Sequence, residues 1–121
     1  MTGHEALNQA LILLGYTDQN GNEQLTRRIM NKAVATVNTV YEDLWQCVSD
    51  EEFKPVNTLS EEIKLKDRAL TALPYGVAAF LAQSENDGDQ QQLWMQTFNK
   101  KRAGLTRLGR IVDTVPHAYD L

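Results

Sequence analysis

Residues 67–85 (DRALTALPYGVAAFLAQSE) form the least polar window of the chain and contain a proline inside a helical pattern. The large apolar residues of this window recur at spacings of three and four, which places them on one side of an α-helix. These residues are Leu70, Leu73, Val77, Phe80 and Leu81. Pro74 has no backbone N–H and its ring crowds the preceding turn, so we expect a bend near residues 70–74. The pattern predicts a buried, Pro-kinked central helix with a neighbour on each side.

Helical patterns also precede and follow this window. Thr2 and Glu5 have the spacing of a capping box at the start of a short first helix, which Gly15 is placed to end. Residues 23–48 carry a continuous apolar stripe and predict the longest helix. The stripe consists of Leu25, Ile29, Ala33, Val37, Val40, Leu44 and Val48, widened by Met30, Val34, Tyr41 and Trp45. Residues 89–112 predict the last long helix, and its expected inward residues are Leu93, Trp94, Phe98, Leu105, Leu108 and Val112.

The segments between the helices differ in length and character. Residues 17–22 have the composition of a turn. A calcium-binding loop is disfavoured here, because Gly21 and Ile29 occupy the wrong positions for one. Residues 49–66 have no clean period, and we expect a long irregular loop with a short strand around residues 53–56 and a helical turn capped by Thr58 and Glu61. The expected fold class is therefore all-α: a compact bundle of about four helices with two long helices around the central one. Residues 1–112 form the single helical domain, and 113–121 form an extended C-terminal tail.

Composition narrows the class of protein further. With 121 residues, 42% hydrophobic and 23% charged, the chain has the balance of a globular protein with one core. Cys47 is the single cysteine, so an internal disulfide is excluded. The longest apolar stretch, residues 69–82, is shorter than the roughly 20 residues that span a bilayer, and no secretory signal precedes it. We expect a protein without membrane contact.

Groups that would carry catalysis are not brought together by the sequence. His4 and His117 lie at opposite ends of the chain, and no phosphate-binding glycine loop, nucleophile elbow or metal-ligand spacing is present. We therefore expect no enzyme, and we assign no catalytic, cofactor-binding or metal-binding residue.

Charge is distributed unevenly along a chain of net charge −4. Residues 1–66 have ten acids against six bases, whereas residues 100–121 have two acids against five bases. An acidic body beside a basic last helix provides two complementary surfaces, which identical subunits joined head to tail require. We expect Arg102, Arg107 or Arg110 to contact acids of a neighbouring subunit. The candidate acids are Glu42, Asp43, Glu51 and Glu52.

The order of the parts resembles the head-to-tail adaptor proteins of tailed bacteriophages, also called connector or head-completion proteins. A short helix ending in LLG leads to a long helix reaching YEDLW, an irregular loop with EEFKPV, the segment DRALTALPYGVAAFLA, and a last helix with LWMQTFNKKRAGL. The resemblance covers about residues 5–108, and ALPYGVAAFLA carries most of it.

The resemblance implies a structural virion protein, made in the bacterial cytoplasm and located in the neck of the virion. It implies a homo-oligomeric ring, a dodecamer, beneath the portal protein, which extends the DNA channel and receives tail or neck proteins. The C-terminal segment would reach the portal, with Val115, His117, Tyr119 and Leu121 as contact candidates, although this tail is shorter than in longer family members. Packaged double-stranded DNA would be contacted without regard to its sequence. The candidates for the channel are Arg27, Arg28, Lys32, Lys100 and Lys101.

Two other functions remain open. A small regulatory DNA-binding protein would use the basic C-terminal helix, although a pI near 5.1 is low for that class. A helical scaffold or chaperone-like partner binder would need no DNA. Binding of portal rings would separate the adaptor from both.

Overall fold

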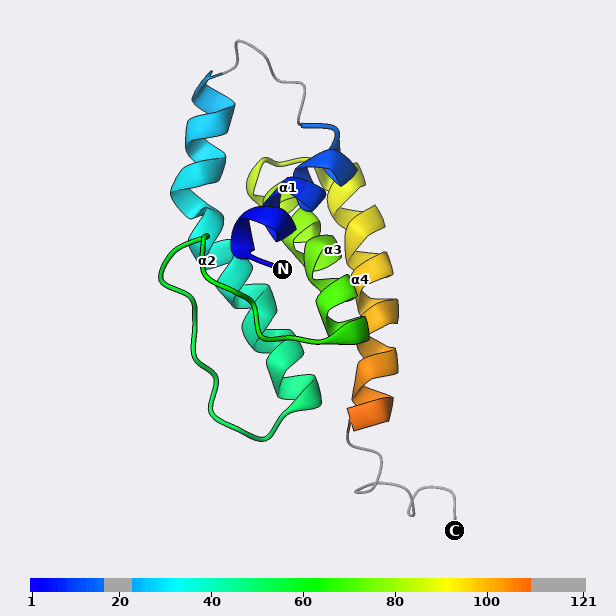
Figure 1. Cartoon of the computed structure of the whole chain (residues 1–121). Helices are drawn as coiled ribbons and strands as arrows, with labels where there is room; N and C mark the ends of the chain where they lie inside the picture. The colour runs from blue at the N-terminus through cyan, green and yellow to red at the C-terminus, as the bar shows by residue number, and fades with distance from the viewer. Residues whose placement is uncertain (17–22, 110–121) are drawn as a thin grey trace.

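Four helices make up the regular secondary structure of residues 1–16 and 23–109, the part of the chain that the computed structural model describes (Figure 1). They are α1 (Gly3–Leu14), α2 (Glu23–Val48), α3 (Asp67–Ser84) and α4 (Gly88–Gly109). α2, α3 and α4 run alternately down and up the bundle, and α1 packs against the upper half of α3, in front of it in this view (Figure 1). The all-α bundle predicted from periodicity is confirmed.

The first helix has both of its ends fixed by local sequence. The Thr2 hydroxyl accepts from the Glu5 N–H at 3.2 Å, and the Glu5 carboxylate accepts from the Thr2 N–H at 2.8 Å. This reciprocal pair is the predicted capping box. Gly15 ends the helix at φ 77°, in the left-handed region where glycine has no steric penalty.

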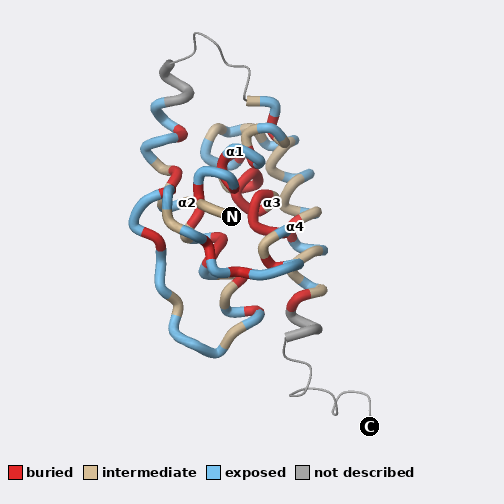
Figure 2. Tube along the Cα trace, in the orientation of Figure 1, coloured by how far each residue is buried: buried red, intermediate tan, exposed pale blue. Residues whose placement is uncertain are grey.

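The core is centred on α3, which contacts α1, α2 and α4. Figure 2 shows buried positions along most of this helix and on the inward faces of its neighbours. Pro74 lies inside α3 and is itself buried, although it cannot donate a hydrogen bond to the preceding turn. Among the described residues, the largest fully buried side chains come from α2 and α3: Leu44, Leu73, Leu81, Val37, Val40 and Val77.

Gly76 marks the closest approach of the helices. A Cβ built at this position would lie 2.5 Å from Cγ1 of Val40 on α2 and 2.8 Å from Cε1 of Phe98 on α4. Both distances are shorter than any real Cβ contact, so a side chain here would push two helices away from α3. The glycine therefore sets the packing distance of the three-helix core.

Residues 49–66 form an irregular segment, which we call the side loop, and it packs against α2 and the start of the chain (Figure 1). Val56, Leu59, Ile63 and Leu65 are buried in the common core. The predicted strand at residues 53–56 is wrong, because the backbone of Val56 pairs with a side chain of α2 instead of another strand. The turn predicted at Thr58 and Glu61 is present but does not continue as a helix: the Glu61 carboxylate accepts from the Thr58 N–H at 3.0 Å, and the Glu61 N–H donates to the Thr58 carbonyl at 3.4 Å.

Three apolar residues expected in the core lie at the surface: Met30 is 45% exposed, Val48 is 40% exposed and Leu93 is 50% exposed. On α4, Phe98 and Leu105 are buried and Trp94 packs against the core partly buried, whereas Leu93 lies about 100° away from Trp94 around the helix. The side chains of Leu25 and Leu108, as well as Val112, the turn at residues 17–22 and the tail at 113–121, lie outside what the structure describes.

Candidate functional site

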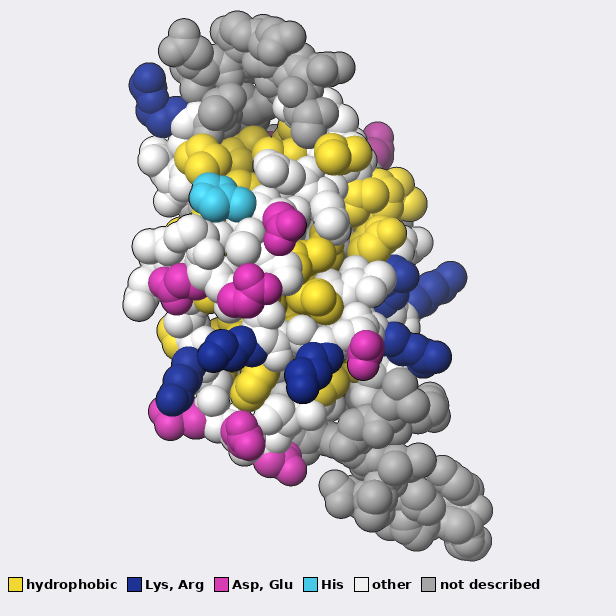
Figure 3. All heavy atoms as spheres, in the orientation of Figure 1, with side chains coloured by type: hydrophobic (Ala, Val, Ile, Leu, Met, Phe, Trp, Pro, Cys, Tyr) yellow, Lys and Arg dark blue, Asp and Glu magenta, His cyan; other side chains and the backbone are white. Residues whose placement is uncertain are grey.

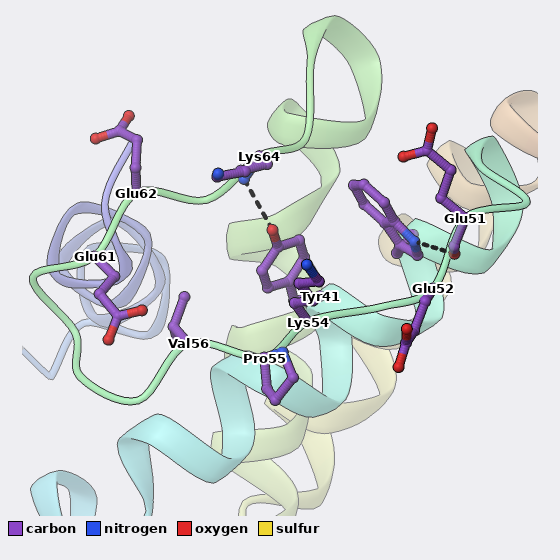
Figure 4. Close-up of a pocket in the computed structure, with 10 residues that line it drawn as sticks. Tyr41, Glu51, Glu52, Lys54, Pro55, Val56, Glu61, Glu62 and Lys64 are labelled. Carbon is purple, nitrogen blue, oxygen red and sulfur yellow. Dashed lines mark hydrogen bonds between the residues drawn. The ribbon is translucent and has the colours of Figure 1, made fainter.

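A hollow of about 310 Å³ lies between the second half of α2 and the side loop (Figure 4). Tyr41 and Trp45 of α2 form one wall of it, and the side loop forms the rest. The Tyr41 hydroxyl accepts from the Lys64 N–H at 3.0 Å, and the Trp45 indole N–H donates to the Glu51 carbonyl at 2.8 Å. Two aromatic residues thus hold both ends of the side loop.

A third attachment fixes the middle of the side loop. The side-chain amide of Asn38 donates to the Val56 carbonyl and accepts from the Val56 N–H, both at 2.9 Å. Phe53 packs edge-on against Tyr41, with ring centroids 4.9 Å apart. The side loop is therefore an ordered surface whose conformation is set by α2.

Four glutamates and two lysines surround the hollow. Figure 4 shows Glu51 and Glu52 at one end of it and Glu61 and Glu62 at the other. The Glu61 carboxylate accepts hydrogen bonds from the Asn57 and Thr58 N–H groups, whereas Glu51 and Glu52 are exposed. Glu51 and Glu52, both predicted as interface candidates, are thus held on a fixed and accessible edge.

A basic cluster lies on the opposite side of the bundle. Arg68 of α3 and Lys100 and Lys101 of α4 line a hollow of about 300 Å³ with Thr71. The Lys101 ammonium lies 4.8 Å from the centroid of the Tyr75 ring, a cation–π contact that leaves the charge near solvent. Figure 3 shows basic side chains projecting from the edge that α4 forms. Arg68 was not among the predicted site residues, because it belongs to the apolar central helix. Its spacing of three residues from Thr71 places both on one polar face of that helix, which could have indicated an exposed base.

The charge of Arg102 is paired with an acid of the same chain. Its Nε lies 2.7 Å from Oδ2 of Asp43, so the pair predicted between subunits forms between α4 and α2 of one chain. Glu42 is exposed beside Asp43. The Arg107 side chain and residues Arg110, Val115, His117, Tyr119 and Leu121 lie outside the described part, so their interface assignments stay predictions.

Two of the channel candidates on α2 are engaged within the chain. Arg28 lies 2.8 Å and Lys32 lies 3.1 Å from the carboxylate of Glu85, whose side chain is 10% exposed. The Arg28 hydrogen bond, followed by Lys32, lowers the pKa of Glu85 despite the opposing effect of burial. The basic start of α2, which is unfavourable for its helix dipole, is thus balanced by an acid at the end of α3.

The candidates for DNA contact therefore fall into two groups. Arg28 and Lys32 contact Glu85 at the C-terminal end of α3, and the exposed Arg27 precedes Arg28 on α2. Lys100 and Lys101 lie with Arg68 near the N-terminal end of α3, about 25 Å away along that helix. The structure does not bring the five predicted residues together.

Tyr16, which directly follows the glycine that ends α1, joins two ends of the fold. Its hydroxyl donates to the Asp87 carboxylate at 3.2 Å, and burial followed by this hydrogen bond raises the pKa of Tyr16 to about 12. Gln90 on α4 donates to the Leu14 carbonyl at 2.8 Å. Both bonds tie the end of α1 to the start of α4.

Comparison of the chain with protein-family models, with curated proteins and with solved structures found no match. Among the described residues, every helix is too short or too polar to cross a bilayer.

Proposed function

We propose that the protein is a head-to-tail adaptor of a tailed bacteriophage, a structural virion protein that forms a ring beneath the portal. The resemblance in the ALPYGVAAFLA segment and the order of its helices supports the family, and the all-α fold agrees with it. The observation that carries the proposal is the separation of charge onto two edges. The side loop wraps one side of the bundle and α4 forms the other (Figure 1).

Two unlike edges are what a closed ring of identical subunits requires. A head-to-tail contact joins different surfaces of two copies, and the rotation between them closes the ring. The side loop has five acids against three bases, and α4 has one acid against four bases. Since Arg102 and Asp43 already pair within the chain, the proposed contact uses Lys100 and Lys101 against Glu51 and Glu52.

The side loop is suited to this contact because it is ordered before binding. Association has to overcome the entropy of fixing mobile side chains and loops. Here Asn38, Tyr41 and Trp45 hold the loop backbone in place in the single chain. Charge pairs at an exposed rim contribute mainly to rate and orientation, so we expect assembly to weaken with salt.

DNA in the channel of such a ring would meet phosphate-neutralising side chains. Arg68 lines the same hollow as Lys100 and Lys101 but takes no part in the proposed subunit contact, so its exposed guanidinium is the group proposed for phosphate contact without base recognition. The portal protein and a tail or neck protein are the other proposed partners, and the neck of the virion is the proposed location.

The proposal is tested by a pair of complementary charge reversals. The first variant carries Lys100→Glu and Lys101→Glu, and the second carries Glu51→Lys and Glu52→Lys. Each variant alone presents like charges at the contact and should remain a monomer. An equimolar mixture can alternate the two variants so that every contact joins opposite charges, which restores rings with an even number of subunits.

Light scattering after gel filtration at low salt, with electron microscopy of the assembled peak, distinguishes the outcomes. Rings from wild type and from the mixture, with monomers from each variant, support the proposal. A wild type that stays monomeric at low salt even with portal rings present would overturn it, as would variants that assemble equally well apart and mixed. Duplex affinity that discriminates between DNA sequences would favour the regulatory protein instead.

A further inference from the structure

An apolar groove of about 550 Å³ opens where the end of α2, the start of α3 and the last turns of α4 meet. Trp45 and Val48 of α2, Leu65 of the side loop and Leu105 of α4 form its floor. Val48 is 40% exposed here, although its place in the α2 stripe would normally bury it. The volume lies in the range of ligand pockets, ~300 to 1,000 Å³.

The rim of the groove is basic. Lys64, Lys66 and Arg68 line it together with one acid, Asp67. All four of these residues are exposed. A segment that fits the groove therefore combines apolar side chains for the floor with carboxylates for the rim.

Residues 110–121 (RIVDTVPHAYDL) have this chemistry and are attached beside the groove. Their apolar side chains include Val115, Tyr119 and Leu121, and their acids are Asp113 and Asp120. Leu105 lines the groove, and α4 ends at Gly109, about one helical turn beyond it.

We propose that residues 111–121 dock in this groove of their own chain. The short connection gives the segment an effective concentration in the mM range, which favours its own groove over that of another molecule. The docked segment would cover Val48 and Trp45. This inference stands independently of the proposed function; if both hold, the segment must leave the groove before it reaches a portal.

Disulfide trapping in the full chain tests the docking. In a Cys47→Ala background, Val48→Cys places a thiol on the groove floor and His117→Cys places one in the middle of the segment. The control combines His117→Cys with Ala35→Cys, an exposed position on α2 about 20 Å from Val48. Bridge formation in dilute protein is followed by mass spectrometry under mild oxidation.

We expect the bridge from Val48→Cys to form within one chain and roughly tenfold faster than that from Ala35→Cys. Equal rates, or bridges formed mainly between chains, would overturn the proposal. Adding Lys66→Glu and Arg68→Glu should slow the bridge toward the control rate, whereas Arg27→Glu with Lys54→Glu should leave it unchanged. A rim reversal without effect would remove the charge argument on which the choice of segment rests.

Discussion

Arg102 on α4 and Asp43 on α2 form an ion pair with 2.7 Å between Nε and Oδ2. These opposite charges therefore already pair within a single chain. The pair also joins α2 and α4, which are separated along the chain by the side loop and α3. The charge pattern of a sequence thus indicates complementary surfaces, but it does not say which of the charges already pair within the chain.

Reversing this ion pair one residue at a time should lower stability, and reversing both should restore it. Arg102→Asp or Asp43→Arg places like charges together and should reduce the free energy of unfolding by about 1 kcal/mol, since both side chains are partly exposed. The double variant should recover most of this loss in urea unfolding. A double variant as unstable as the sum of the singles would show that the charges do not interact.

Gly76→Ala should destabilise the fold although alanine favours helices. The added Cβ would meet Val40 and Phe98 at under 3 Å, and overpacking of this kind costs about 1 to 3 kcal/mol. The matched control is Gly104→Ala on α4, where nothing lies within 4 Å of the new atom, so stability should rise by up to ~1 kcal/mol. Urea unfolding midpoints of both variants provide the test, and a stabilised Gly76→Ala would contradict the packing described for α3.

Glu85→Gln should remove a contribution to stability that depends on acid pH. The pKa of Glu85 is lowered from its usual 4.5, so the folded state releases this proton more readily than the unfolded state. The contribution is present above pH 4.5 and is lost as pH falls through the lowered pKa. We expect Glu85→Gln to be less stable than wild type by about 1 kcal/mol at pH 7. The two should converge in urea unfolding once the pH has fallen below the lowered pKa of Glu85.

Tyr16→Phe should change the response to alkaline pH. The pKa of Tyr16 is raised from 10.0 to about 12, so the wild type loses stability as pH rises between these values. The variant has no phenol at this position and should unfold at the same urea concentration at pH 10 as at pH 11.5, apart from effects shared with wild type. Parallel slopes for wild type and Tyr16→Phe would contradict the bond to Asp87.

Asn38→Ala should loosen the side loop. Its amide satisfies both the N–H and the carbonyl of Val56, and removing it leaves two partly buried backbone groups without that partner. Such groups cost about 1 to 3 kcal/mol each when unsatisfied, so for the two groups we expect a loss of at least about 2 kcal/mol. Hydrogen exchange should accelerate at Val56 but not in α3. Asn31→Ala, at an exposed position of α2, serves as the control.

Helix positions could be predicted from the sequence because each signal is local. The stripe of residues 23–48 coincides with α2, and the capping box at Thr2 and the glycine at position 15 end α1 as expected. Central placement of α3 followed from its low polarity. Leu93 and Val48 were assigned to the core wrongly, because periodicity defines a face of a helix without saying how far a neighbour covers it.

The side loop and the charge pairs could not be predicted in the same way. Its conformation depends on Asn38 and Tyr41, which are far from Val56 and Lys64 in sequence and carry no pattern that points to them. Glu85 is likewise paired with bases more than fifty residues away. Contacts of this kind are set by how the helices pack, which is known only once the fold is known.

The amide of Asn38 gives Val56 the donor and acceptor that a neighbouring peptide would give it. Because Asn38 bonds only to backbone atoms of Val56, these bonds do not depend on which side chains of the side loop point outward. The outward side chains of the side loop can therefore be substituted one by one, which changes the chemistry of this surface while the Asn38–Val56 bonds and the helices beneath stay as they are.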